Sequence, residues 1–416
     1  MKHNVICTLF FTLLMLTGCG EDPQMSQTEV EPVPDVPAET VDEGMGVIDN
    51  PHFTESQTAV SNRLNEVAMD LFSKCCIAAG EDKNMSVSPV TAIANLAIIA
   101  NSVDDETARS IMDYIGCEDM GELNTVVNRL LRLLANPRYG AFLSVASSVW
   151  YDSSYTVDDD YIDKMLKTFG ADVNSADMGS QSSFDMINGW CSEKTHGLIP
   201  EIFDNPAQIQ ELEWISALYF AGEWHQPFDE SLTTRENFNT ADGVVETDMM
   251  HTVITNSYIK TDTYECIGME FLEGLYNVYL YLPAEGVGMA RFFESLKNKG
   301  ESRPAYIHLG LPKFAVSTDL DMTEIYAASG IKTMGVKPAA MGIDISGDMK
   351  SKQKNTIQFD EKGAVAASVE VGNWGSFPPG QSEPIEVHIT FDRPFYYIIV
   401  GPYTNSCVMA GYIARP

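Results

Sequence analysis

Histidine is the side chain that most often performs acid–base or metal chemistry near neutral pH, so the seven histidines are the first residues to consider. None belongs to an H-E-x-x-H zinc motif, and the chain contains neither a G-x-S-x-G nucleophile turn nor a nucleotide-binding P-loop. Fifty-nine acidic residues make chance pairs of carboxylates inevitable, so such pairs identify no site. We therefore predict no catalytic residue, no metal site, no cofactor and no enzymatic activity. The histidines are His3, His52, His196, His225, His251, His308 and His388.

Cysteine is the other residue type that could act as a nucleophile or a ligand, and the chain has eight. No C-x-x-C pair occurs, so neither a zinc site nor a dense disulfide framework is predicted. Cys7 and Cys19 lie in the N-terminal segment described next. We interpret the other six as buried free thiols that pack as small apolar residues, while a disulfide among them stays open. These six are Cys75, Cys76, Cys117, Cys191, Cys266 and Cys407.

Residues 1–18 have the pattern of a signal peptide, with a basic start followed by the mostly apolar stretch Val5–Leu16. This stretch is shorter than the roughly 20 residues that span a bilayer. The sequence L-T-G-C that ends at Cys19 resembles the lipobox of bacterial lipoproteins, which implies that Cys19 is acylated and becomes the first mature residue. An ordinary signal peptide with a chance cysteine is the alternative.

Residues 19–51 are predicted to form a disordered tether. Between Gly20 and Asn50 there are nine acidic residues, four prolines and no lysine or arginine, a composition that cannot bury a core. The acidic residues directly after Cys19 resemble the surface-export signals of some Gram-negative lipoproteins. We therefore expect a protein anchored by lipid to the outer membrane and exposed at the cell surface, with a periplasm-facing anchor left open.

The bulk composition limits the partners of the chain. It has 416 residues, of which 44% are apolar, so a large core is possible, and its formal net charge is −33. Such a charge argues against nucleic acid, whose phosphates require a basic surface, and against heparin or an anionic membrane surface as ligands.

From residue 52 to 416 the hydrophobic pattern predicts a single α+β domain. Apolar residues from Val60 to Phe72 fall on one helix face, and Ser88-Pro89 precedes an apolar helix that ends at Ala100. Strands dominate later, which differs from an alternating βαβ pattern. Further helices are predicted at Asp104–Ile115, Tyr161–Phe169 and Ser183–Cys191, and strands at Phe142–Tyr151, Leu212–Phe220, Tyr276–Leu282, Ala305–Leu311, Ile357–Phe359, Ile385–Phe391, Phe395–Val400 and Val408–Ile413.

A series of short motifs from about residue 55 to the C-terminus resembles the serpin family, and their order and spacing make the resemblance specific. It implies a helix-rich N-terminal part around a large central mixed or antiparallel sheet, with an exposed reactive-centre loop. The motifs are Asn84–Pro89 (N-x-x-x-S-P), Ile187–Trp190 with Thr195–Ile199, Ala217–Trp224 with Pro227-Phe228, Met249-Met250, Leu311–Phe314 (L-P-K-F), Arg393–Phe395 and Met409–Gly411.

The segment Phe359–Phe377 resembles the hinge of the serpin reactive loop, which reads E-x-G followed by small residues. In the family mechanism a protease cuts the loop, and the hinge side inserts into the sheet as a new strand. A dozen inserted residues at about 3.3 Å each would move the attached protease roughly 40 Å. Small hinge residues suit this step, because bulky or charged ones would obstruct a packed sheet. The hinge residues are Glu361, Gly363, Ala364, Ala366, Ala367 and Ser368.

Glu370 departs from the hinge pattern, because it shares the alternate face of Ala364, which faces inward after insertion in the family. The resemblance implies, by counting along the loop as in serpins, that the cleaved bond is Ser376-Phe377 or Phe377-Pro378, with cleavage beside Trp374 and Gly375 as the alternative. The aromatic residues indicate chymotrypsin-, elastase-, subtilisin- or papain-like endopeptidases as targets. No basic residue lies between residues 363 and 393, which argues against trypsin-like targets.

The resemblance also points to a sheet-opening region, where serpins commonly carry Asn and His. Here Ser216 and Gln353 occupy the matching positions, with Ser88 nearby and Ser147 in place of another usual Asn. Trp224 matches the tryptophan at the end of the sheet where insertion begins. The polar replacements can still form hydrogen bonds, so a polar cluster with changed partners is expected.

The sequence therefore predicts a monomeric suicide inhibitor of endopeptidases that is anchored to a bacterial surface. The alternative is a serpin-fold binding protein that does not inhibit. A third hypothesis, an unrelated lipoprotein that binds glycan or peptide, conflicts with the ordered motifs.

Overall fold

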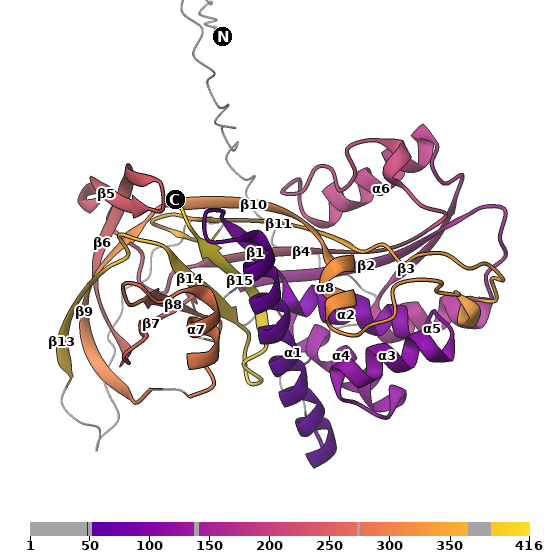
Figure 1. Cartoon of the computed structure of the whole chain (residues 1–416), viewed down its shortest axis with the longest axis horizontal. Coiled ribbons are helices and arrows are strands. Elements are labelled where there is room, and N and C mark those ends of the chain that lie inside the picture. Colours follow the sequence, from indigo (N-terminus) through magenta and orange to yellow (C-terminus); the bar gives the residue numbers. More distant parts are fainter. Residues whose placement is uncertain (1–47, 49–51, 137–140, 273–274, 299, 365–383) are drawn as a thin grey trace, which may run out of the picture. The chain divides into compact units, whose positions relative to one another are not determined.

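The computed structural model describes residues 48, 52–136, 141–272, 275–298, 300–364 and 384–416 (Figure 1). All of them fall within one of the two units into which the chain divides, Val33–Pro416. The described residues form helices and two sheets, and each sheet contains strands that are far apart in the sequence. This arrangement confirms the predicted α+β class.

Helix boundaries follow local capping chemistry. Helix α1 (Glu55–Ala79) begins at Thr54, whose side chain forms a reciprocal capping box with Gln57. Helix α2 (Pro89–Ala100) begins at Ser88 with proline as its first residue, and all of its residues are buried. The remaining described α-helices are α3 (Asp105–Ile115), α4 (Met120–Leu134), α5 (Asp159–Phe169), α6 (Gln181–Lys194), α7 (Met289–Ser295) and α8 (Met322–Ala328).

The larger sheet has nine described strands in the order β1-β15-β14-β8-β7-β6-β9-β13, with β5 paired to β6. Strands β13 and β9 are parallel, while the other neighbours are antiparallel. The strands are β1 (Met85–Val87), β5 (Thr234–Thr240), β6 (Gly243–Lys260), β7 (Tyr264–Glu270), β8 (Asn277–Pro283), β9 (Ser302–Pro312), β13 (Ile385–Thr390), β14 (Phe395–Val400) and β15 (Cys407–Ile413). Every residue of β14 and β15 is buried, because these apolar strands are covered on both faces.

The smaller sheet has six described strands in the order β10-β11-β12-β4-β2-β3. Strand β12 is only two residues long and is antiparallel to both β11 and β4, so β4 and β11 run in the same direction. Among the described residues, no register pairs β4 directly with β11. The strands are β2 (Ala141–Asp152), β3 (Asp172–Ala176), β4 (Leu212–Glu223), β10 (Phe314–Asp321), β11 (Lys352–Phe359) and β12 (Gly363–Ala364).

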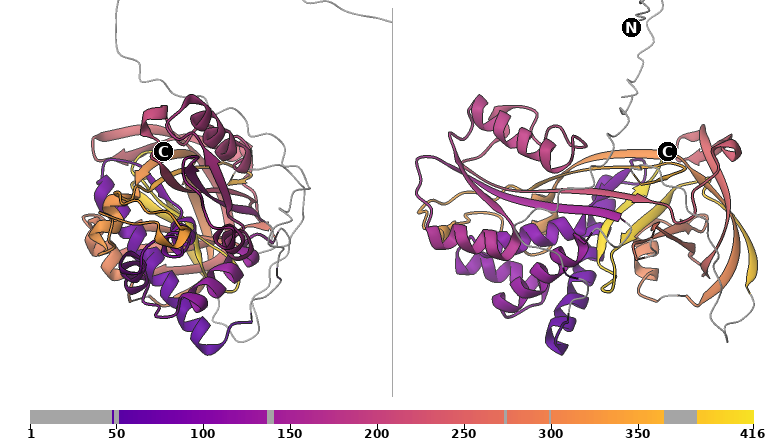
Figure 2. Two further views of the ribbon diagram at one scale, coloured as in Figure 1. Left: turned by 90° about the vertical axis from the view of Figure 1, so that its right-hand side faces the viewer. Right: turned by 180° about the vertical axis from the view of Figure 1, so that it is seen from behind.

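Helices cover both faces of the smaller sheet, as Figures 1 and 2 show from opposite sides. Successive side chains of β4 point to opposite faces of the sheet, so alternate residues pack against different helices. Ile215 and Ala217 pack in a cluster with residues of α6, whereas Trp214 and Leu218 belong to the main core with α2. Strand β4 is therefore buried almost throughout, and any new strand beside it enters a packed layer.

The six cysteines beyond the N-terminal segment are all buried and free, and no disulfide joins any of the described residues. This confirms their interpretation as packed thiols. Burial raises the pKa of Cys75 to about 12 and has the same effect on Cys407, so neither thiol ionises near neutral pH. Of the described helices, none is both long enough and apolar enough to cross a bilayer.

Candidate functional site

Strand β12 lies between β11 and β4 at one end of the smaller sheet. Ala364 pairs with Phe359 on β11 and with Gly222 on β4, while Gly363 pairs with Glu223. Ala364 is completely buried, so this part of the predicted hinge already occupies a position inside the sheet. A strand that lengthened β12 beyond Ala364 would run between β4 and β11.

A tight turn connects β11 to β12. The backbone N–H of Asp360 donates to the carbonyl oxygen of Gly363 at 3.0 Å. The Asp360 carboxylate accepts from the backbone N–H groups of Lys362 and Gly363 at 2.8 and 3.2 Å. An aspartate that bonds to backbone two residues later stabilises a turn, so the sequence D-E-K-G reverses the chain directly before the hinge.

Glu361 is fixed in this turn by two partners. It is 5% exposed, and its carboxylate lies 2.6 Å from Lys313 Nζ and accepts a hydrogen bond from Thr233 at 2.7 Å. Burial alone would raise the pKa of Glu361, but the bonds from Lys313 and Thr233 outweigh it and hold the pKa below its ordinary value. The ionised carboxylate thus ties the hinge to the end of β9 and to the segment after β4.

Trp224 lies at the end of the smaller sheet, beside the hinge. Its indole N–H donates to the carbonyl oxygen of Asp360 at 2.9 Å, and its backbone N–H donates to that of Lys362 at 2.8 Å. The ring stacks on Phe271 with centroids 4.8 Å apart and meets Phe359 edge-on at 5.2 Å. Trp224 therefore holds both the turn and the last residue of β11.

Close backbone approach explains the small residues at this point. A Cβ atom on Gly363 would lie 2.1 Å from the carbonyl oxygen of Gly222, and a Cβ atom on Gly222 would lie 2.8 Å from the Phe271 ring. Neither clash can be relieved by rotating a long side chain, so both positions require glycine.

The predicted sheet-opening residues form two separate pairs. The Gln353 side chain accepts from the backbone N–H of Ser88 at 3.0 Å and donates to the Ser88 carbonyl oxygen at 2.9 Å. The hydroxyls of Ser147 and Ser216 are 3.0 Å apart. Asn355, which the sequence analysis did not identify, donates to the Gln353 side chain at 3.0 Å.

A cavity of about 240 Å³ lies at the far end of β4 and β11, near the first residues of both strands. Glu213 and Lys352 are among the residues that line it. Burial raises the pKa of Glu213 to about 8, although the backbone N–H of Gln210 donates to its carboxylate at 2.7 Å. Residues at the starts of both strands thus line this cavity, while β12 lies between the other ends of the two strands.

The other predicted site residues lie outside the described residues. They are Ala366, Ala367 and Ser368 of the hinge, Glu370, the reactive-bond candidates Trp374, Gly375, Ser376, Phe377 and Pro378, and the lipid attachment residue Cys19.

The amino-acid sequence matches a known protein family. The sequence model described as "Serpin (serine protease inhibitor)" matches residues 62–416. The chain belongs to the serpin family. Because this family is described as one of serine protease inhibitors, its general function is protease inhibition and not catalysis.

Individual serpins resemble the chain along most of its length. A serine protease inhibitor of Cyanea capillata is 27% identical over 383 residues, covering 86% of this chain and 98% of the relative. A probable non-inhibitory serpin-Z9 of Oryza sativa is 24% identical, covering 82% of this chain and 83% of its own. The native structure of the thermophilic serpin tengpin matches with a TM-score of 0.76 at 20% identity, covering 89% of this chain and 97% of that one.

Proposed function

We propose that this serpin is a suicide inhibitor of endopeptidases that acts by loop cleavage followed by strand insertion. The observation that carries the proposal is β12, a two-residue strand that lies between two strands running in the same direction. Ala364 of this strand is already buried in the sheet, so the residues after it could insert by lengthening the same strand. The chain offers small residues for that purpose at Ala366, Ala367 and Ser368.

The register of β12 specifies where each inserted residue would arrive. Every residue after Ala364 moves one position back along β4 from Gly222 and along β11 from Phe359. Ser368 then faces Leu218 and Asn355, on the side of β11 whose residues are buried. A side chain that arrives there must be small, because β4 and α2 already fill this layer.

Six positions after Ala364, the same register brings Glu370 between Ser216 and Gln353. A carboxylate at this buried place needs hydrogen-bond donors. The Ser216 hydroxyl can turn to donate, and the Gln353 amide, which uses one hydrogen on the Ser88 carbonyl oxygen, has a second to offer. We infer that the departures from the family pattern at Ser216, Gln353 and Glu370 compensate one another.

This inference predicts a coupled effect of two substitutions. Ser216→Ala removes one donor, so we expect it to slow insertion roughly ten- to a hundredfold, since a hydrogen bond to a charged group contributes about 1.5–3 kcal/mol. In the Glu370→Ala background no carboxylate arrives, and the same substitution should have no further effect. The measurement is the fraction of protease recovered as covalent complex in the four combinations. If Ser216→Ala lowers the fraction of covalent complex equally with and without Glu370, Ser216 does not donate to Glu370. The effect would then come from the lost contact with Ser147, which both proteins share.

The target class is proposed from the loop sequence. Cleavage between Ser376 and Phe377, between Phe377 and Pro378, or beside Trp374 suits chymotrypsin-, elastase-, subtilisin- or papain-like endopeptidases. In a test of inhibition, the purified protein is mixed with each protease in turn and then diluted. Activity that stays lost after dilution is expected for at least one of them, whereas full recovery in every case would exclude suicide inhibition by this loop.

The alternative function is a serpin fold that binds a partner without inhibiting. The similarity to a probable non-inhibitory rice serpin supports this alternative. The two functions differ in one outcome, because a non-inhibitory member is cleaved in its loop without forming a covalent complex. The hinge residues that follow Glu361 are small and uncharged, which favours inhibition.

We further propose that Cys19 is acylated and anchors the protein to the outer membrane at the bacterial surface. The lipobox-like sequence and the acidic segment after it support this proposal. Cys19→Ser should move the protein from the membrane fraction to the soluble fraction, since the acyl chains provide the anchor. A Cys19→Ser protein that still sediments with membranes would contradict the proposal, and antibody labelling of intact cells separates surface exposure from a periplasm-facing anchor.

A further inference from the structure

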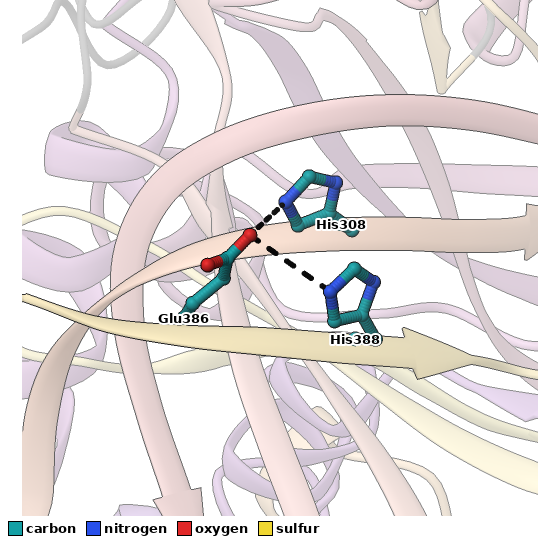
Figure 3. A group of neighbouring side chains, drawn as sticks. All are labelled: His308, Glu386 and His388. Carbon is teal, nitrogen blue, oxygen red and sulfur yellow. Dashed lines mark hydrogen bonds and ion pairs between the residues drawn. The ribbon is translucent and has the colours of Figure 1, made fainter.

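Three potential metal ligands come together where strands β9 and β13 pair (Figure 3). His388 is the register partner of His308, and Glu386 precedes His388 by two residues, on the same face of β13. No metal site is predicted from the sequence, because His308 lies 78 residues before Glu386 and only the parallel pairing of the two strands brings them together.

The three side chains converge on one point. Glu386 Oε1 lies 3.1 Å from His308 Nε2 and 3.9 Å from His388 Nε2. Dashed lines in Figure 3 mark these two interactions. One ligand atom from each residue lies within 4.8 Å of the others. The two imidazole rings are nearly parallel, with centroids 4.2 Å apart. Both ring nitrogens therefore face the same carboxylate.

These separations suit a tetrahedral zinc ion. Bonds of about 2.0–2.2 Å from Zn²⁺ to nitrogen and oxygen place the ligand atoms about 3.3–3.6 Å from one another. The observed distances of 3.1 and 3.9 Å lie on either side of that range. The side chains are 40, 69 and 73% exposed for His308, Glu386 and His388, so small rotations can equalise the distances.

The surroundings give a cation access to this point. A cavity of about 390 Å³ opens beside the rings, lined by His308 and His388 and also by His251 and Asp229. It leaves room for a water molecule as a fourth ligand. The net charge of −33 raises the local concentration of cations around the protein.

We propose that this protein binds one Zn²⁺ ion through His308 Nε2, His388 Nε2 and the Glu386 carboxylate, with water in the fourth position. Two imidazoles and a carboxylate form a ligand set that Zn²⁺ uses elsewhere in proteins. The ion bridges two strands from distant parts of the chain. Because β13 is the edge strand of its sheet and pairs only with β9 among the described strands, the bridge fastens this edge. The site does not depend on the proposed inhibition.

The test is calorimetric titration of the purified full chain with zinc chloride. We expect one ion per chain, and affinity more than about tenfold lower in His308→Ala and in His388→Ala, since each removes a ligand. His251→Ala is the matched control, because His251 lines the same cavity but its Nε2 is 2.6 Å from Glu236, outside the cluster. Its affinity should equal that of the wild type.

Thermal unfolding and cobalt spectroscopy provide independent readouts. Zn²⁺ should raise the melting temperature of the wild type and of His251→Ala but not that of His388→Ala, since only a bound ion stabilises the native state. Co²⁺ in place of Zn²⁺ should give the intense visible absorption of a four-coordinate ion. Absence of zinc binding by the wild type, or equal affinity in His308→Ala and the wild type, would overturn the proposal.

Discussion

Ala364→Arg is expected to turn the protein from an inhibitor into a substrate. Ala364 is completely buried between Phe359 and Gly222. Insertion would lengthen β12 from this residue onward. Because this position is already inside the sheet, an arginine there displaces β12, and the cleaved loop can insert only by burying an unpaired charge at a cost of several kcal/mol. Since each 1.4 kcal/mol slows a step tenfold, insertion becomes slower than release of the cleaved loop by the protease.

The measurement for Ala364→Arg is the ratio of covalent complex to cleaved, released inhibitor on a denaturing gel. We expect the complex to fall below detection while cleavage continues. Gln358→Arg is the matched control, because it adds the same charge at a half-buried position on the other face of β11 and should leave the complex intact. If Ala364→Arg forms as much complex as the wild type, strand insertion is not the mechanism.

Cleavage of the loop is expected to raise the melting temperature on the order of 10–20 °C. About a dozen newly inserted residues would form backbone hydrogen bonds with β4 and β11, each contributing roughly 0.5–1.5 kcal/mol. The uncleaved protein is then kinetically stable, and not in its state of lowest free energy. The inserted strand would end beside the cavity that Glu213 lines. The register of β12 places Trp374 next to Glu213 at that end.

The check on this second prediction is calorimetry before and after limited cleavage by a protease that the protein does not inhibit. Cleaved Ala364→Arg should show a smaller rise, because its strand cannot enter. An unchanged melting temperature after cleavage of the wild type would mean that the loop does not insert. It would favour the binding function without inhibition.

The sequence predicted most of the elements whose apolar pattern is regular. Helix α2 and strands β4, β14 and β15 are buried along nearly their whole length, and their apolar runs identified them. Strand β11 was recognised only at its apolar end, although Lys352–Phe359 alternates throughout. Its inward positions include Gln353 and Asn355, and polar residues on a buried face conceal the alternation. Helix α4 was missed despite a clear amphipathic pattern.

The candidate site was predictable where local sequence determines it. The hinge turn follows from Asp360 and Gly363, which are close in the chain. The contacts of Glu361 with Lys313 and Thr233 join distant segments, and so do those of Gln353 with Ser88. Sequence alone does not give the strand register on which such pairs depend. The same reason hid the approach of His308 to Glu386.

The most direct test of strand insertion with a trapped protease is a denaturing gel of the purified protein mixed with chymotrypsin, elastase, subtilisin and papain, combined with mass spectrometry of the released C-terminal fragment. We predict a covalent band at the mass of one of these proteases plus the protein without its released C-terminal fragment, and a fragment that begins at a residue between 375 and 378. Complete cleavage by every protease without such a band would contradict the account.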